Sequence, residues 1–138
     1  MSNVELHEQA HKVMTDEGAE AVSAFMAPDI VFTDHAQGAT MKGRDEATGW
    51  LSAWKTAFSD AAVTEGTYLE AGDWTISRFR ARGTNDGEFA GLPPTGRAVD
   101  LDCCELIRWQ DGKSVEGDFY YDAMTVMVQL GHVPPAGA

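Results

Sequence analysis

One stretch near the C-terminal end of the chain constrains the fold more than any other part of the sequence. It contains two long β-prone runs, residues 97–109 and 114–121, and Asp111-Gly112 between them is a strong signal for a tight hairpin turn. Asp122 ends the second run, and the apolar spacing of residues 123–130 predicts a short helix after it. The stretch therefore predicts an antiparallel hairpin that leads directly into a helix, with a carboxylate at the junction.

The rest of the chain places helices first and strands after them. Apolar residues at helical spacing, with Pro28 as a stop signal, predict helices over residues 3–15, 17–27 and 43–59. Alternation and turn signals predict strands over residues 62–70 and 74–83, a short β-prone run at 30–33, and loops over 38–42 and 85–96. Helices followed by an antiparallel meander are typical of an α+β fold. We expect one domain over residues 1–138, in which a highly curved antiparallel sheet wraps around the N-terminal helices and encloses a pocket.

The charge balance excludes several classes of partner. The chain has 22 acidic and 10 basic residues, which gives a formal net charge of −12, and such a surface repels nucleic acid and anionic membranes. No apolar run approaches the roughly 20 residues of a membrane-spanning helix, and the N-terminal residues lack the pattern of a secretory signal. We therefore expect a cytoplasmic protein. Cys103 and Cys104 are adjacent in a predicted strand and point to opposite faces, so we expect unpaired thiols.

Histidines in the first third of the chain are candidates for a site. His7 and His11 lie four residues apart on one face of the predicted first helix. Because no third ligand follows at a recognised spacing, we interpret them as solvated or partly packed and predict no metal site. Asp34 and His35 end the short β-prone run, where they form either a catalytic pair or a polar loop cluster.

Alternation along the strands separates two kinds of charged residue. Glu105 shares a face with apolar neighbours, so we expect a buried carboxylate paired with an arginine such as Arg78 or Arg80. Those two arginines and Arg82 share one face with Trp74, which we interpret as a solvated or interface face paired with acidic neighbours. A sheet covered on one side leaves its other side exposed, which predicts a homodimer or homotetramer through the outer face.

A set of short motifs, spread over about residues 5–131, resembles the SnoaL-like polyketide cyclase family of the NTF2-like superfamily. The motifs are Gly43-Arg44-Asp45-Glu46-Ala47, Phe58-Ser59-Asp60-Ala61, Gly72-Asp73-Trp74, Gly83-Thr84, Gly87-Glu88-Phe89-Ala90-Gly91-Leu92-Pro93-Pro94-Thr95-Gly96, Asp111-Gly112-Lys113, and Asp122 followed by Gln129-Leu130-Gly131. The proline-containing loop and the terminal Gln-Leu-Gly are together specific for this family. The resemblance implies an α+β cone with a cavity.

The resemblance also implies an activity and a site. It implies a cofactor-free and metal-free enzyme of aromatic polyketide metabolism that closes a ring by intramolecular aldol condensation in a flat polycyclic carbonyl compound. The family's catalytic carboxylate corresponds to Asp122, for which a helix N-cap is the alternative role. His35 is the second catalytic candidate. We assign substrate binding to Phe32, Trp50, Trp54, Asn85, Phe89, Leu92 and Tyr120, although the two tryptophans could also be plain core.

Two departures from the family pattern keep other functions open. Family members commonly carry histidine where this chain has Asn85, and His-Trp where it has Gly117-Asp118. One alternative is a divergent member that takes part in hydroxylation of an anthracycline-type intermediate. The other is a non-catalytic module that binds a small molecule.

Overall fold

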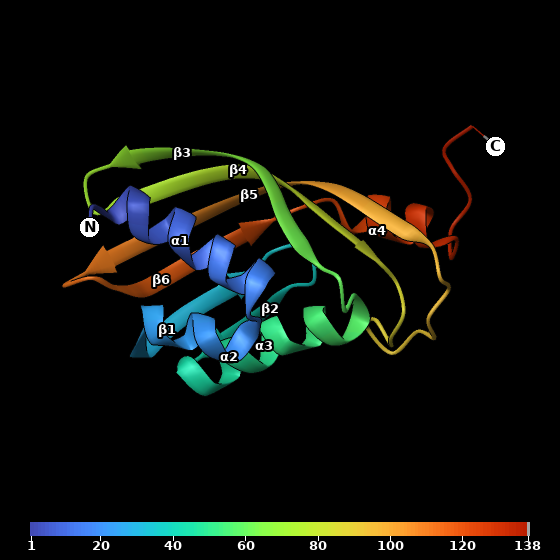
Figure 1. Cartoon of the computed structure of the whole chain (residues 1–138). Helices are drawn as coiled ribbons and strands as arrows, with labels where there is room; N and C mark the ends of the chain where they lie inside the picture. Colours follow the sequence, from blue (N-terminus) through green and yellow to red (C-terminus); the bar gives the residue numbers. More distant parts are fainter. Residues whose placement is uncertain (138) are drawn as a thin grey trace.

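A six-stranded, strongly curved sheet forms the body of the protein, and α1, α2 and α3 lie on its concave side (Figure 1). The computed structural model describes residues 1–137. The strands are β1 Met26–Asp34, β2 Ala39–Lys42, β3 Ala62–Ala71, β4 Trp74–Thr84, β5 Ala98–Gln110 and β6 Lys113–Tyr120. The helices are α1 Asn3–Asp16, α2 Ala19–Val22, the 3-10 turn η1 Ser23–Phe25, α3 Arg44–Ala57 and α4 Ala123–Leu130. This is the α+β cone expected from the sequence.

The sheet has the strand order β2-β1-β6-β5-β4-β3. Strands β3 to β6 form the predicted antiparallel meander, and β1 adds to β6 in parallel, so the sheet is antiparallel except at this pair. The β5–β6 hairpin turns at Asp111 and Gly112, whose φ angles of 50° and 76° are those of the turn that matches strand twist. The turn sets the pairing of Gln110 with Lys113, and the register shifts once between Arg108 and Trp109 before the rest of the hairpin pairs.

The chain between α1 and α3 differs from the prediction. The helix expected over residues 17–27 is only α2 plus η1, and β1 begins already at Met26. Pro28 lies within β1 rather than before it, and the loop expected over residues 38–42 is largely strand β2. A proline is tolerated there because the β1–β6 register shifts between Met26 and Val31. Strands β1 and β2 thus extend the sheet beyond the predicted meander.

The two faces of the sheet differ as alternation predicted. On β4, Thr75, Ser77 and Phe79 are buried on the concave side. On the outer face, Arg78 pairs with Asp102 at 2.7 Å and Arg80 pairs with Asp100 at 2.9 Å. The arginine row is therefore paired with acidic neighbours, as expected. The homodimer or homotetramer proposed for this face stays a prediction.

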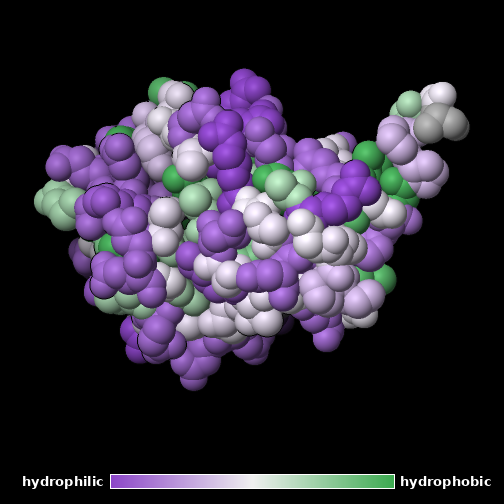
Figure 2. Space-filling view, turned by 45° about the vertical axis from the view of Figure 1, so that its right-hand side comes forward, coloured by the Kyte–Doolittle hydropathy of each residue, from purple (hydrophilic) through white to green (hydrophobic). Residues whose placement is uncertain are grey.

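One face of the protein is mostly polar. Figure 2 shows a largely hydrophilic face on which apolar side chains form only small groups. No helix within residues 1–137 is long and apolar enough to cross a membrane. Cys103 and Cys104 are unpaired, as predicted, and burial raises the pKa of the Cys103 thiol to about 12, so this thiol is unreactive at neutral pH.

Candidate active site

A largely apolar cavity of about 140 Å³ lies between the concave face of the sheet and helices α1 and α3. Its wall is rich in aromatic rings, contributed by Phe25, Phe32, Trp50, Trp54, Phe58, Phe79, Trp109 and Phe119. Trp50 and Trp54 thus lie on the concave side, as expected from the apolar face of α3. Of the residues assigned to substrate binding, Phe32, Trp50 and Trp54 line this cavity, and their role in binding stays a prediction.

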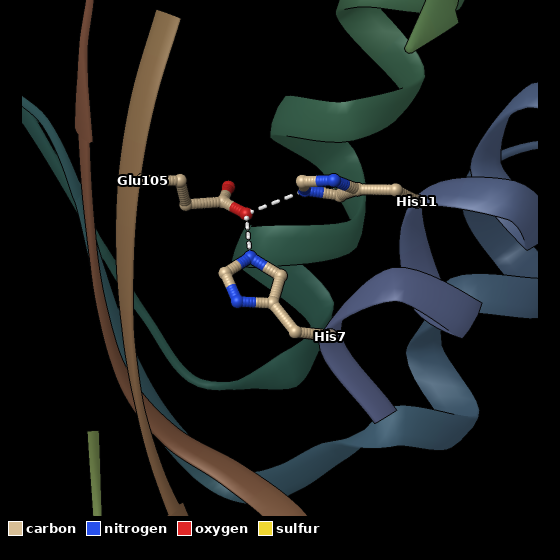
Figure 3. Close-up of side chains that lie close together, drawn as sticks. All are labelled: His7, His11 and Glu105. Carbon is tan, nitrogen blue, oxygen red and sulfur yellow. Dashed lines mark hydrogen bonds and ion pairs between the residues drawn. The ribbon is translucent and has the colours of Figure 1, made fainter. Parts of the chain in front are cut away.

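A cluster of three ionisable residues interrupts the apolar wall. His7 and His11 reach in from α1, and Glu105 reaches in from β5 (Figure 3). Oε1 of Glu105 accepts hydrogen bonds from Nε2 of His7 at 2.9 Å and Nε2 of His11 at 2.8 Å. The side chains of the three residues are 2%, 11% and 13% exposed. We call this group the His–Glu–His cluster.

Hydrogen bonds behind the imidazoles support one arrangement of the protons in the cluster. The indole N–H of Trp109 can only donate, and it donates to Oγ1 of Thr75 at 2.8 Å. Thr75 then donates its own proton to Nδ1 of His7 at 2.7 Å. The Tyr68 hydroxyl, whose pKa is raised by burial, donates likewise to Nδ1 of His11 at 2.8 Å. In this arrangement the Nε2–H groups of both imidazoles donate to an ionised Glu105, and we assign His7, whose pKa burial lowers, as neutral.

The pKa shifts in the cluster agree with this proton assignment. Burial raises the pKa of the Glu105 carboxyl, but the hydrogen bonds from His11 and His7 outweigh burial and bring the pKa to about 2. Burial also lowers the pKa of His7, against the opposing effect of Glu105. The cavity wall thus carries a carboxylate next to the uncharged imidazole of His7. Its second oxygen, Oε2, receives no hydrogen bond from the described residues and is left to the cavity (Figure 3).

The same three residues could also hold a metal ion. Their ligand atoms lie within 4.8 Å of one another, so Glu105 supplies the third donor that the sequence did not reveal. A metal on both Nε2 atoms requires each imidazole to move its proton to Nδ1. At His7 that proton would be donated to the Thr75 hydroxyl, which has a second lone pair beside the one that accepts from Trp109. The donor set is thus compatible with proton transfer and with metal binding.

The sequence contains all three residues of the cluster but does not show that they lie together. The interpretation of His7 and His11 as solvated or partly packed was wrong for His7, which is almost fully buried, and missed their common partner. The expected pairing of Glu105 with Arg78 or Arg80 was also wrong. Ser77 is the β4 residue opposite Glu105, so both arginines lie on the other face of the sheet. The missing information was the path of α1, which contacts β3 and β4 across the concave side.

The cluster makes a prediction about acid stability. Because the pKa of His7 is lowered in the folded state, the unfolded chain binds a proton first as the pH falls below the model value of 6.5. The associated stability is complete above pH 6.5 and is lost as the pH falls toward the lowered pKa. In urea denaturation between pH 7.5 and pH 5, we expect the wild type to lose stability more steeply than His7→Gln. Parallel pH profiles for the two proteins would contradict the assignment of a neutral His7.

Asp122 lies outside the cavity. Its Oδ1 accepts hydrogen bonds from the backbone N–H groups of Met124 at 2.9 Å and Thr125 at 3.4 Å, and its Oδ2 accepts from the Thr125 hydroxyl at 3.0 Å. The Asp122 side chain is exposed to solvent. This is the geometry of the N-cap of α4, the alternative role considered for Asp122. Asp122 instead borders a shallow pocket on the outer side of the cone, together with Arg78 and Tyr120, and its base role stays a prediction.

His35 and Tyr120 lie together on the outer side of the cone. Nε2 of His35 is 2.8 Å from Oδ1 of Asp118, and its ring stacks on Tyr120 with centroids 4.3 Å apart. Neither residue is part of the cavity wall. The neighbouring carboxylate of Asp34 points the other way and is fully buried, as expected for consecutive residues at a strand end.

Asp34 is a structural carboxylate that positions part of the cavity wall. Its Oδ2 accepts hydrogen bonds from the indole N–H of Trp50 and the Tyr121 hydroxyl, each at 3.0 Å, and Gln37 donates to both of its oxygens. These four donors satisfy a buried carboxylate without a cation. They also hold the Trp50 ring in place against Phe32 and Phe119.

The loop over residues 85–96 packs against the cavity wall on the side that faces away from the cavity. The fully buried Asn85 donates from its side chain to the carbonyls of Ala57 and Gly87 and accepts from the N–H of Thr95. Phe89 packs on Trp54, with ring centroids 5.3 Å apart, and pairs through its backbone with Leu92. None of Asn85, Phe89 and Leu92 lines the cavity, so the loop closes over the wall rather than forming it.

Gly117 explains why one expected histidine is missing. It lies on the concave face of β6, where a Cβ atom would be 2.3 Å from the ring of Phe32 and 3.0 Å from Ile107. The Phe32 ring therefore occupies the space that a side chain at position 117 would need. The cavity instead receives two imidazoles from α1, at positions that the family resemblance did not indicate.

The α+β cone is similar to a solved structure described as having a ketosteroid isomerase-like fold. A protein of this fold from Catenulispora acidiphila matches 97% of the chain and all of its own length, with a TM-score of 0.81 and 23% identity. IdmH, a putative polyketide cyclase from Streptomyces antibioticus, matches 92% of the chain and 96% of its own length, with a TM-score of 0.78 and 27% identity. The fold class is thus that expected from the sequence.

The family follows from the sequence comparison. Residues 5–130 match the family model of the SnoaL-like polyketide cyclases, and the chain belongs to this family. The aklanonic acid methyl ester cyclase DnrD of Streptomyces peucetius is 34% identical over 90 residues, which are 64% of this chain and 60% of that relative. The corresponding enzyme DauD of Streptomyces sp. (strain C5) is also 34% identical over 90 residues, which are 54% of its length. The match thus covers less than two thirds of either relative.

Proposed function

We propose that this chain is an acid–base enzyme that closes a ring by intramolecular aldol condensation in a flat aromatic carbonyl compound bound in the cavity. The observation that carries the proposal is the His–Glu–His cluster, an ionised carboxylate with one open oxygen in a wall of aromatic rings. Membership of the SnoaL-like polyketide cyclase family and the similarity to two cyclases support the reaction type.

Glu105 takes the role of the base in this proposal, in place of Asp122. Oε2 of Glu105 removes a proton from the carbon next to a ketone, and the resulting enolate carbon bonds to a second carbonyl carbon of the same molecule. The new alkoxide oxygen then takes the proton back from Glu105. The net change moves one hydrogen from carbon to oxygen and forms one C–C bond, without an oxidant or a reductant.

The pKa of Glu105 restricts the substrate. A carboxyl with a pKa of about 2 is a weak base, so it can only remove an unusually acidic proton. A C–H group conjugated with a flat aromatic ketone meets this requirement, because the enolate delocalises into the rings. A substrate that fills the cavity also displaces water from Oε2, and further desolvation raises the carboxyl pKa and strengthens the base.

Hydrogen–deuterium exchange tests the proposal without the natural substrate. We expect the protein to accelerate deuteration of the acidic C–H group in arylacetones such as 4-hydroxyphenylacetone, relative to buffer alone, as followed by NMR in D₂O. The wild-type rate is compared with that of Glu105→Gln at the same concentration. Binding of these ketones without faster exchange would instead favour a non-catalytic module that binds a small molecule. An exchange rate that Glu105→Gln leaves unchanged would show that Glu105 is not the base.

A further inference from the structure

We infer that the cavity selects small, uncharged aromatic ligands of one ring that carry an acidic hydrogen-bond donor, such as an enol or a phenol, and rejects polycyclic ones. The inference takes its binding site from the proposed function and names a substrate class for it. Two features of the wall carry it independently: the space left by Phe32, and the hydrogen-bonding state of Glu105.

The volume of the cavity sets the ligand's size. About 140 Å³ is available in the cavity, and a dry apolar cavity of roughly 150 Å³ holds a benzene ring. Pockets for larger drug-sized ligands start at roughly 300 Å³. The cavity therefore accommodates one ring, and a ligand of three fused rings needs part of the wall to move.

Phe32 is the part of the wall that limits the volume. Its ring lies over Gly117 of the neighbouring strand and is 4.8 Å, centroid to centroid, from the Trp50 ring. The side chain is buried in β1, which has β2 on one side and β6 on the other. Trp50 cannot easily turn away to make room, because Asp34 holds its indole N–H. Close packing on these sides keeps the Phe32 ring in the cavity.

The cluster sets the ligand's chemistry. Both ring nitrogens of His7 and both of His11 already have hydrogen-bond partners, so the cluster presents only the acceptor Oε2 to a ligand. An ionised, partly desolvated oxygen without a partner is stabilised by an O–H or acidic C–H donor. An anionic ligand brings a second negative charge beside Glu105 and is disfavoured.

Several donors elsewhere in the wall are already engaged and do not change this preference. Trp50 donates to Asp34 at 3.0 Å, and Trp109 donates to Thr75 at 2.8 Å. Ser114 donates to the carbonyl of Phe25 at 3.2 Å. Arg82 borders the cavity as well, but its guanidinium is bound to Thr64, Glu65 and Asp100.

A panel of uncharged and charged aromatic ligands tests size and chemistry separately. Protein-observed NMR titration at pH 7 would measure the affinity of phenol, toluene, benzoate, 2-naphthol and 9-phenanthrol. We expect the wild type to bind phenol, to exclude benzoate and to lose affinity from phenol through 2-naphthol to 9-phenanthrol. Wild-type binding of 9-phenanthrol as tight as that of phenol would overturn the size limit. Binding of benzoate as tight as that of phenol would overturn the donor preference.

Two variants separate the two features. In Glu105→Gln, we expect the affinity ratio of phenol to toluene to fall by about tenfold or more, as for loss of a hydrogen bond to a charged group. In Phe32→Ala, or in Phe32→Leu should the alanine variant not fold, we expect 9-phenanthrol to bind at least about tenfold more tightly than in the wild type, because apolar area is buried in the new space. An unchanged ratio in the first variant, or unchanged 9-phenanthrol affinity in the second, would refute the corresponding feature.

The ligand panel also distinguishes failure of this inference from failure of the proposed function. Selective phenol binding without accelerated C–H exchange would support the inference on ligand selection and contradict the proposed enzymatic function. Accelerated exchange in polycyclic ketones, together with no preference for one ring, would support the proposed enzymatic function and contradict the inference on ligand selection.

Discussion

Glu105→Gln is expected to lower the rate of substrate C–H exchange by roughly 10²–10⁴-fold, the usual contribution of a positioned acid–base group. Glutamine has almost the same shape as glutamate, and its carbonyl oxygen can accept the same two Nε2–H hydrogen bonds from His7 and His11 that Oε1 accepts now. It cannot take a proton from carbon. The variant therefore removes the base while preserving the contacts that hold α1 against the sheet.

Asp122→Asn is the matched control for this experiment. Asparagine is also a good N-cap residue, so α4 keeps most of its capping hydrogen bonds. Because Asp122 is exposed and lies outside the cavity wall, we expect its substitution to leave the exchange rate within about twofold, as for residues away from the reacting atoms. Melting temperatures of the same preparations separate lost activity from lost folding.

The opposite result would also be informative. If Asp122→Asn abolishes exchange and Glu105→Gln does not, the base lies at the end of β6, as the family resemblance implied. The substrate would then bind on the outer side of the cone, near His35 and Tyr120, and the cavity would have no catalytic role. Equal and large losses in both variants, with unchanged melting temperatures, would contradict the assignment of a single base.

Much of the fold was predictable because local signals decide it. The Asp111-Gly112 turn, the alternation along β4 and β5 and the capped helix after Asp122 are each encoded within a few residues. The segment around Pro28 was mispredicted, because a proline inside a strand is tolerated only at a ladder irregularity. That irregularity depends on pairing with β6, more than 80 residues later in the chain.

The site was harder to predict because its parts come from distant segments. His7 meets Glu105 across 98 residues of sequence, and only the path of α1 over the sheet brings them together. Family resemblance pointed to the carboxylate at the strand-to-helix junction and to two missing histidines. It gave no reason to expect that α1 supplies two imidazoles instead, or that Phe32 fills the position facing Gly117.

Gly117→Ala is expected to destabilise the protein by about 3 kcal/mol, the upper part of the usual range for overpacking a core. The added Cβ would be 2.3 Å from one ring carbon of Phe32 and 2.5 Å from the next, far inside van der Waals contact. Gly49→Ala is the matched control, because Gly49 lies on an exposed part of α3 and a Cβ there meets nothing within 4 Å. We expect that control to be neutral or to stabilise by up to about 1 kcal/mol, from helix propensity.

A double-mutant cycle with Phe32→Ala shows whether the clash with Phe32 is the cause. Phe32→Ala alone should cost about 3–5 kcal/mol, through lost burial and a cavity. Once the ring is gone, alanine at position 117 fills space instead of overlapping with it, so the double variant should be at least about 2 kcal/mol more stable than additivity predicts. Urea denaturation of the four proteins measures this coupling. Additive effects would mean that the cost of Gly117→Ala does not come from the Phe32 ring, and the one-ring limit on the ligand would then lose its physical basis.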